Sequence, residues 1–545
     1  MQAQLHRSFR PLFLTLMAVG GSWLLGACQR QAPEAQLPGD ILPETVLVPQ
    51  SAPVVLAFAT NPEEAFRTHP DLLAQWENWT AEALAETGSE FPKEDIQTWA
   101  GEQFTMAVVV PNLVPTASDP VPGILFGAST RNTDLSGQFL AQVRQQAEAE
   151  GANFERRQEQ GVTLHIQTNG DPGERWVTAE FGNRFVAVAN DPEVMEQAVA
   201  VYRGEMESVS RSDLFRAAAE QLYTDGTLAF AYLDFEALQA SSESFGAWME
   251  DLDPATLQSL QPLRSFAMAA HWQEQGLRMR MLTQMDPEAH LQAGLQPARG
   301  ELIQRLPGSS LVVISTQQIA QRWQALLPQL EEDPSIKASL DELRAEFRAN
   351  TRLDLEKDVI AWMDGEMALL VAPDAQAHPL LQGMGAAWVI ESSQKDKANA
   401  ALAQLDRLAQ ESGARVTEAG GQVTWADPLF NQPLLIRAWE GNNLIVTSST
   451  GALQTIAQRQ GNLLPQTEPL KTLYAQLHKP NYGYFLLNWQ GIRTVLEAAL
   501  PGGLATLDPE ARELLTRIDG IGLTSYPSGE HAFGMELLVT VPPKP

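Results

Sequence analysis

The same order of sequence segments occurs twice in this chain of 545 residues, and this repeat limits the possible folds more than any other feature. The segment DIQTWAGEQFTMAVVVP, Asp95–Pro111, matches DVIAWMDGEMALLVAP, Asp358–Pro373. The offset between matching positions falls steadily from 264 to 254 residues along the first copy. Pairs that define it include Leu42 and Leu306, Trp99 and Trp362, Leu214 and Leu470, and Phe235 and Trp489. A duplication followed by short insertions and deletions explains this drift, whereas chance matches would scatter.

We therefore predict two tandem homologous units, at residues 41–286 and 301–545, joined by a linker at residues 287–300. Each copy contains strand patterns as well as helix patterns. Phe104–Val110 and Met367–Ala372 are short and almost wholly apolar, which predicts buried central strands.

Local signals place helices and hairpins between these strands. A helical pattern begins at Asp134 and ends at Gly151, where glycine favours a helix stop. Trp176–Ala189 predicts two strands around Gly182-Asn183, because both residues tolerate positive φ. Asp191-Pro192 suits a helix cap followed by a first-turn proline. Hairpins inside a copy argue against a doubly wound parallel sheet. We predict an α+β fold in which each unit has a mixed or mainly antiparallel sheet with helices packed on one face.

The first 27 residues have the parts of a lipoprotein signal peptide. Arg7 and Arg10 give a basic start, residues 11–25 are mostly apolar, and Leu25-Gly26-Ala27-Cys28 resembles a bacterial lipobox. Cys28 is the only cysteine in the chain. We expect cleavage before Cys28 and lipidation of its sulfur, with residues 28–40 as a tether to the membrane. The alternative is an N-terminal transmembrane anchor with an incidental cysteine.

Composition then excludes several classes of function. With Cys28 acylated, no thiol is left for a disulfide, a cysteine-type zinc site or a nucleophile. The chain has 37 Lys and Arg against 67 Asp and Glu, a formal net charge of −30. Such a surface repels phosphate backbones, so we expect no nucleic-acid partner. It also repels anionic headgroups, so the acyl chains on Cys28 must hold the protein at the membrane.

The chain resembles a family of uncharacterised, internally duplicated proteins found mainly in cyanobacteria and described as a domain of unknown function. The resemblance is carried by LPETVLVPQSAPVVLAFATNPEEAF, Leu42–Phe66, and by TRLDLEKDVIAWMDGEMALLVAP, Thr351–Pro373. It covers most of residues 41–541. The first copy departs from the pattern because it lacks the counterpart of Asp364. The resemblance implies the fold and a location in the cell envelope on the extracytoplasmic side, periplasmic or lumenal. It implies no activity and no site residues.

No catalytic constellation emerges from the sequence. It contains no G-x-S-x-G elbow, no P-loop and no H-E-x-x-H motif. Gly383-Met384-Gly385 and Gly520-Ile521-Gly522 lack the third glycine of a dinucleotide fingerprint. Its histidines do not have the spacing of metal ligands; those considered are His69, His165, His271, His290, His378, His478 and His531. We therefore predict no catalytic residue, no cofactor and no metal, and we favour a protein that is not an enzyme.

Three groups of residues nevertheless merit a structural test. Asp354, Glu356 and Asp358 alternate, so an extended segment would present them on one side, although a solvated face is the simpler explanation. Asp234 aligns with Asn488, so this acid is not kept in both copies. Aromatic side chains gather at Trp76 and Trp79 and at Tyr482, Tyr484, Phe485 and Trp489. Core packing explains both aromatic groups, whereas exposure would favour a protein or glycan contact.

Two functional hypotheses remain. The first is an exported, lipid-anchored envelope protein that acts as a non-catalytic binding or scaffold module for another envelope protein. The second is a hydrolase or small-molecule binder that uses a cleft between the two units. A flat exposed apolar surface would favour the first hypothesis, and a cleft lined by carboxylates would favour the second.

Overall fold

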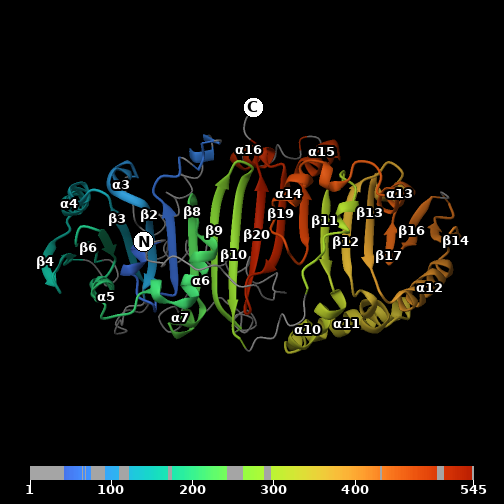
Figure 1. Ribbon diagram of the computed structural model, residues 1–545, viewed down its shortest axis with the longest axis horizontal. Helices are drawn as coiled ribbons and strands as arrows, with labels where there is room; N and C mark the ends of the chain where they lie inside the picture. The colour runs from blue at the N-terminus through green and yellow to red at the C-terminus, as the bar shows by residue number, and fades with distance from the viewer. Residues whose placement is uncertain are drawn as a thin grey trace.

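The computed structural model describes residues 42–542, except for residues 64, 68, 71, 75–92, 110–121, 170–174, 242–261, 288–295, 430–431, 500–501 and 503–508. Its centre is one sheet of 20 strands, which Figure 1 shows as a continuous band across the molecule. The strands of the N-terminal half are β1 Val54–Ala59, β2 Ala100–Val109, β3 Gly123–Thr130, β4 Phe154–Glu159, β5 Val162–Gln167, β6 Val177–Phe181, β7 Phe185–Ala189, β8 Thr227–Asp234, β9 Leu263–Gln273 and β10 Gly276–Met285. Those of the C-terminal half are β11 Val312–Gln317, β12 Glu366–Pro373, β13 Met384–Glu391, β14 Arg415–Ala419, β15 Gln422–Ala426, β16 Pro433–Glu440, β17 Asn443–Thr447, β18 Tyr484–Asn488, β19 Gly520–Pro527 and β20 Ala532–Thr540.

The pairing of the strands runs in the same order from both edges. From one edge the order is β4, β5, β6, β7, β3, β2, β1, β8, β9 and β10. From the other edge it is β14, β15, β16, β17, β13, β12, β11, β18, β19 and β20. Every described pairing is antiparallel, so the prediction of mixed helices and mainly antiparallel sheet is confirmed.

The prediction of a separate sheet in each unit is wrong. Strands β10 and β20 pair over nine positions, from Gly276 opposite Thr540 to Gln284 opposite Ala532. They lie side by side near the middle of the sheet in Figure 1. Each strand would otherwise present a row of unpaired backbone groups at an edge, and their pairing removes both edges. The boundary between the halves is therefore a seam within one sheet.

Helices cover both faces of the sheet. They are α3 Lys93–Trp99, α4 Thr133–Ala149, α5 Pro192–Arg203, α6 Asp213–Leu222, α7 Phe235–Ala240, α10 Ile319–Leu330, α11 Pro334–Thr351, α12 Lys395–Glu411, α13 Thr450–Gln458, α14 Leu470–Gln476, α15 Trp489–Ala499 and α16 Pro509–Arg517. We call the face that carries Val55 face A and the opposite face, which carries Leu56, face B. Helices α5 and α6 pack on face A of the N-terminal half, and α13 and α14 pack on face A of the C-terminal half. Helices α4 and α12 pack on face B.

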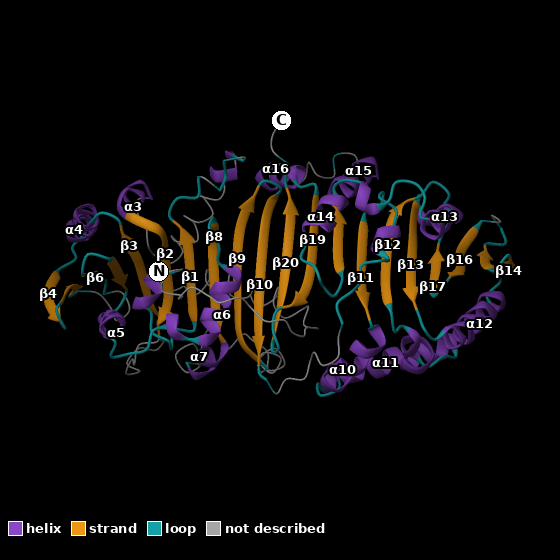
Figure 2. Ribbon diagram, viewed as in Figure 1, coloured by secondary structure: helices purple, strands orange, loops and turns teal. Residues whose placement is uncertain are grey.

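The prediction that helices pack on one face is therefore wrong. Successive side chains of a strand point to opposite faces. Because Val55 and Leu56 are both apolar and both buried, each face of β1 needs its own cover. Figure 2 shows that α10, α11 and α12 form a line along one end of the strands in the C-terminal half.

Several local predictions are confirmed. The Asp191 carboxylate caps α5 by accepting a hydrogen bond from the Glu193 backbone N–H at 2.8 Å, and Pro192 occupies the first turn. Helix α4 begins with the side chain of Asn132 accepting from the Leu135 N–H. The β6–β7 hairpin turns at Gly182, whose φ of +58° is accessible to glycine without strain.

Candidate functional site

The most unusual surface of the molecule lies on face B of the C-terminal half. Thirteen apolar side chains form two rows there, and each residue lies opposite the next across paired strands. The first row is Val539, Ile521, Leu487, Val312, Val371 and Ala386, and the second is Leu537, Leu523, Phe485, Ile314, Leu369, Trp388 and Val446. We call these residues the open face. None of them is buried: Leu369, at 38 %, and Ala386 are exposed, and the other eleven are half-buried.

The corresponding row of the N-terminal half is buried. Leu56, Met106, Phe126 and Val188 lie opposite one another on β1, β2, β3 and β7. By strand order and register they match Ile314, Leu369, Trp388 and Val446 of the open face. All four N-terminal residues are less than 9 % exposed, and Met106 is only 3 % exposed. The same kind of sheet surface is thus covered in one half and open in the other.

The cover of the N-terminal half includes this chain's own helices. Phe139 and Leu140 of α4 pack with Trp99, the last residue of α3, over the buried row. The rings of Trp99 and Phe139 lie 5.3 Å apart. In the C-terminal half, α12 places Ala398 and Leu402 in a cluster with Ile390 and Leu444, and Trp388 and Val446 at one end of the open face also pack against this cluster. The described helices of that half therefore leave the rows of the open face partly uncovered.

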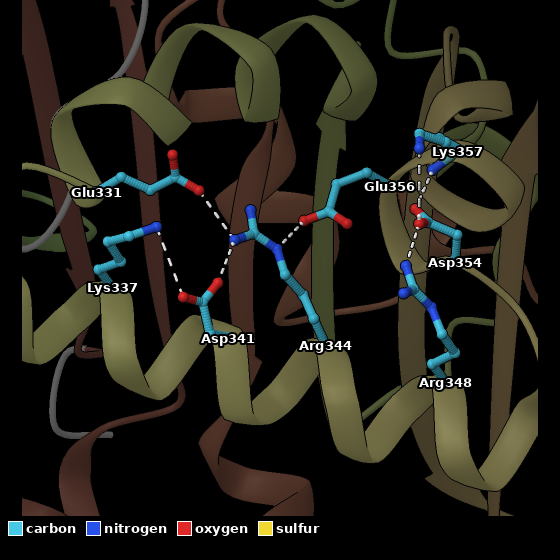
Figure 3. Close-up of polar contacts among 8 residues, drawn as sticks. All are labelled: Glu331, Lys337, Asp341, Arg344, Arg348, Asp354, Glu356 and Lys357. Atoms are coloured by element: carbon cyan, nitrogen blue, oxygen red, sulfur yellow. Dashed lines mark hydrogen bonds and ion pairs between the residues drawn. The ribbon is translucent and has the colours of Figure 1, made fainter.

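An ion-pair network fixes α11 at the border of this half, as Figure 3 shows. The Arg344 guanidinium contacts three carboxylates: Glu331 at 2.9 Å, Asp341 at 3.0 Å and Glu356 at 2.6 Å. These hydrogen bonds, chiefly those to Glu356 and Glu331, raise the pKa of Arg344 above its ordinary value. A second pair joins Arg348 to Asp354 at 2.5 Å. The network anchors α11, although none of the helix's residues is buried.

The acidic cluster of the sequence lies beside this network and does not adopt the extended conformation that was the less favoured of its two explanations. Residues Leu355–Val359 form one π-helical turn. Asp354 accepts a hydrogen bond from the Lys357 N–H at 3.0 Å, and Asp358 accepts one from the Asp354 N–H at 2.7 Å. The first of these bonds is the main cause of the lowered pKa of Asp354. Reciprocal capping by carboxylates closes the turn, so these acids have structural roles.

Helix α11 also carries an apolar stripe. Ile336, Leu340, Leu343 and Phe347 recur at helical spacing. Leu340 and Phe347 are half-buried, whereas Ile336 is 40 % exposed and Leu343 is 49 % exposed. Exposed apolar side chains at such spacing are typical of surfaces that contact another helix.

Polar groups gather at the seam, on face A. Arg278 of β10 forms an ion pair with Glu536 of β20, whose second oxygen accepts from the His478 N–H at 2.8 Å. Burial, with the nearby Arg280 and Arg278, lowers the pKa of His271 to about 4. Its Nε2 lies 2.9 Å from the hydroxyls of both Thr224 and Thr227. The ion pair of Arg278 and Glu536 joins the halves, whereas His271 contacts threonines of its own half.

Several other residues named from the sequence have structural roles. His69 is fully buried, accepting from the Trp272 indole N–H at 3.0 Å and lying 2.9 Å from the Val541 carbonyl oxygen. Asp234 and Asn488 cap α7 and α15 by accepting hydrogen bonds from the Ala237 and Gly491 N–H groups. No group of three His, Cys, Asp or Glu residues suited to a metal occurs in the described part of the chain. Cys28, Trp76, Trp79 and His290 lie outside the described residues.

The aromatic group of the second copy is divided by the structure. Tyr482 and Tyr484 are buried in the core, as core packing predicts. Phe485 points to the opposite face and belongs to the open face. The indole of Trp489 donates to the Leu515 carbonyl oxygen at 2.7 Å and so joins α15 to α16. Core packing thus explains only part of the group, because Phe485 is half-buried on the opposite face of the sheet.

Ser392 and Lys395 have the S-x-x-K spacing that serine acyl-transfer enzymes use, a motif that is not among the candidates named above from the sequence. The Ser392 hydroxyl is fully buried and donates to the Trp362 carbonyl oxygen at 2.6 Å. The Lys395 ammonium lies 5.4 Å from the centre of the Trp439 ring. The two side chains therefore serve packing. Asp364, which the first copy lacks, accepts from the Ser393 N–H just before α12.

A pocket of about 540 Å³ lies in the N-terminal half, beside the start of α5. Its lining includes the carboxylates of Glu155, Asp191, Glu193 and Glu196 and the guanidinium groups of Arg157 and Arg175. Asp191 caps α5 and Glu196 pairs with Arg157, so two of the carboxylates already have structural partners. The pocket is a weaker candidate than the open face because its charged groups are used in folding.

Comparison with known proteins places the chain in a family. A family model described as "Protein of unknown function (DUF3352)" matches residues 11–541. The chain belongs to this family. No curated protein matches the sequence. Among solved structures, crystal form IV of TP0453 is 12 % identical, covers 44 % of this chain and 80 % of its own, and has a TM-score of 0.27. Crystal form III of TP0453 is 11 % identical, covers 49 % of this chain and 83 % of its own, and has a TM-score of 0.26. Within the described residues of this DUF3352 member, no helix has the length and apolarity to span a membrane.

Proposed function

We propose that this protein is an exported, lipid-anchored component of a cyanobacterial envelope that acts as a non-catalytic binding or scaffold module for another envelope protein. In this proposal residues 1–27 are a signal peptide, Cys28 carries acyl chains, and residues 28–40 tether the folded part on the extracytoplasmic side of the membrane.

The observation that carries the proposal is the open face. Thirteen apolar side chains on one sheet surface, none of them buried, exceed the scattered exposure that is normal for a soluble protein. A contiguous apolar surface costs free energy in water and is retained where a partner covers it. Helix α11 carries further exposed apolar side chains, Ile336 and Leu343, in the same half of the molecule.

The internal duplication, which we propose gave units 41–286 and 301–545, explains how such a surface arises. The matching strand orders of the two halves support a common ancestor for both units. In one unit the chain covers face B with its own side chains, whereas in the other the same face stays available. Divergence between the two copies therefore provides one covered, stabilising surface and one binding surface.

The alternative of an enzyme in a cleft between the units is the less favoured hypothesis. Strands β10 and β20 pair directly, so the described boundary between the halves is a sheet and not a cleft. Two of the titratable groups at this seam, Arg278 and Glu536, form an ion pair with each other.

In-cell crosslinking followed by affinity purification tests the proposal, with Cys28→Ser as the control. The expected result is a small, reproducible set of envelope proteins that is recovered with the native protein and lost with the variant. Radioactive palmitate should label the native protein and not the variant. A folded, membrane-bound protein that recovers no partner above the control would contradict the proposal.

A further inference from the structure

We propose that the open face binds an amphipathic α-helix of the partner protein, and that the polar side of this helix is basic. This inference rests on the proposed function, because it names the kind of segment that the same binding surface recognises.

The N-terminal half shows how this molecule covers such a surface. Side chains of α4 and the end of α3 pack over the row that includes Leu56 and Met106, and these residues are buried. The matching row, which includes Ile314 and Leu369, has the same apolar character but is only partly covered. A helix supplied by another chain would give the open face what the N-terminal half obtains from its own chain.

The chemistry of the two rows also favours a helix over an extended peptide. All thirteen side chains are aliphatic or aromatic, and only Trp388 carries a polar atom. An extended peptide laid on this surface would bury backbone groups without hydrogen-bond partners, which costs several kcal/mol per group by order of magnitude. A helix satisfies its backbone internally and can present an apolar stripe.

The negative charge of this protein indicates which residues the polar side of the partner's helix carries. The formal net charge of −30 makes contact with a second copy of this chain or with anionic headgroups unfavourable. Glu332, Glu342 and Glu346, on and beside α11, form no ion pair with another described residue. A helix with Lys and Arg on its polar side would meet complementary charge on this acidic protein.

The size of the face sets the length of a test peptide. The longer row crosses seven strands, from β20 to β17, and neighbouring strands lie about 4.8 Å apart, so the row spans roughly 29 Å. A helix rises about 1.5 Å per residue, so about 19 residues cover that distance.

The experiment measures binding of a fluorescent, amphipathic Leu/Lys peptide of about that length to the full mature protein. A peptide of the same composition, scrambled so that it has no apolar side, is the ligand control. Leu369→Asp and Ala386→Glu place a charge on the open face, and Leu429→Asp places one at a leucine that is 85 % exposed elsewhere. Far-UV circular dichroism and thermal melting establish that each variant is folded.

We expect the amphipathic peptide to bind the native protein and the Leu429→Asp variant alike, and to bind Leu369→Asp and Ala386→Glu at least tenfold more weakly. Because both face variants add negative charge, purely electrostatic binding would be unchanged or tighter in them. Such a result, or equal binding of the scrambled peptide, would overturn the helix proposal.

Vesicles of zwitterionic phosphatidylcholine are tested in parallel. If the native protein binds the vesicles but not the peptide, and Leu369→Asp abolishes vesicle binding, the open face binds lipid and the helix proposal is overturned. The in-cell crosslinking experiment does not depend on the peptide or vesicle results. Failure of the helix proposal can therefore be distinguished from failure of the proposed function, which would leave no crosslinked partner.

Discussion

Leu369 of β12 and Met106 of β2 hold the same position in the strand pairing of their halves, yet Leu369 is 38 % exposed and Met106 is 3 % exposed. Both residues lie on face B in the middle of a strand. Their neighbours across the strands are apolar in both halves. The difference between them is the cover, which the chain supplies over Met106 and leaves incomplete over Leu369.

This difference predicts that truncation of Met106 and of Leu369 to alanine lowers the free energy of unfolding by different amounts. Met106→Ala should lower the free energy of unfolding by about 2–4 kcal/mol, because it leaves a cavity in a packed core. Leu369→Ala should lower it by less than about 1 kcal/mol, because water already reaches the side chain. Urea unfolding of both variants measures the two values. Equal losses would mean that the open face is as tightly packed as its counterpart.

The free energy of unfolding should depend on the buried ion pair at the seam between the halves. In the pair of Arg278 and Glu536, the Glu536 side chain is 3 % exposed and that of Arg278 is 16 % exposed. Removing one charge leaves the other uncompensated, so Glu536→Gln and Arg278→Met should each lower the free energy of unfolding by about 3 kcal/mol. The double variant should lose clearly less than the sum of the two. Additive losses in this double-mutant cycle, again measured in urea, would show that the pair does not couple the halves.

Stability should fall on mild acidification because of His271. Its pKa is about 4 in the folded protein against an ordinary 6.5, since burial and the nearby Arg280 and Arg278 disfavour the imidazolium. Above pH 6.5 both folded and unfolded states carry neutral imidazole. As pH falls from 6.5 toward 4, only the unfolded state gains the proton, so the contribution to stability is lost in that window. After allowance for solvent screening, the loss between pH 7 and pH 5 is on the order of 1 kcal/mol.

His271→Gln provides the matched control for this pH dependence. The variant should show a shallower decline in the free energy of unfolding over the same pH range, because glutamine does not titrate. Identical pH profiles for the native protein and the variant would contradict the assignment to His271.

The attachment of α11 should depend on Arg344. Arg344→Met removes contacts with Glu331, Asp341 and Glu356 together, and we expect faster amide hydrogen exchange across residues 334–351 with little change in the sheet. Lys337→Met, which removes one exposed pair with Asp341, should leave exchange unchanged. Exchange in α11 that is the same in both variants would show that packing, and not the network, holds the helix.

Local chemistry made much of the fold predictable. The Asp191-Pro192 cap, the hairpin at Gly182 and the helix from Asp134 follow from residue types whose preferences act over a few neighbours. The repeat of segments predicted related halves with hairpins, and the strand orders agree with that pattern.

The seam and the open face could not be predicted in the same way. Pairing of Gly276 with Thr540 joins residues 264 positions apart, and no local signal marks which strand edges will meet. Met367–Ala372 is almost wholly apolar, which predicted burial on both faces. In the structure Ala368 and Leu370 are buried on face A, whereas Leu369 is exposed on face B. An apolar pattern in the sequence indicates that burial of a surface is favourable. It does not indicate whether side chains of the same chain pack over that surface.

The most direct test of the account is thiol labelling at the open face. Leu369→Cys introduces a free thiol into a chain whose only natural cysteine is Cys28, and Leu429→Cys is the exposed control. A membrane-impermeant maleimide is applied to the purified protein and to open envelope fragments, with the native protein giving the background. The account predicts that Cys at position 369 reacts readily in the purified protein and is protected in the envelope, while Cys at position 429 reacts equally in both. Equal labelling of position 369 in both preparations would contradict the claim that a partner covers the open face.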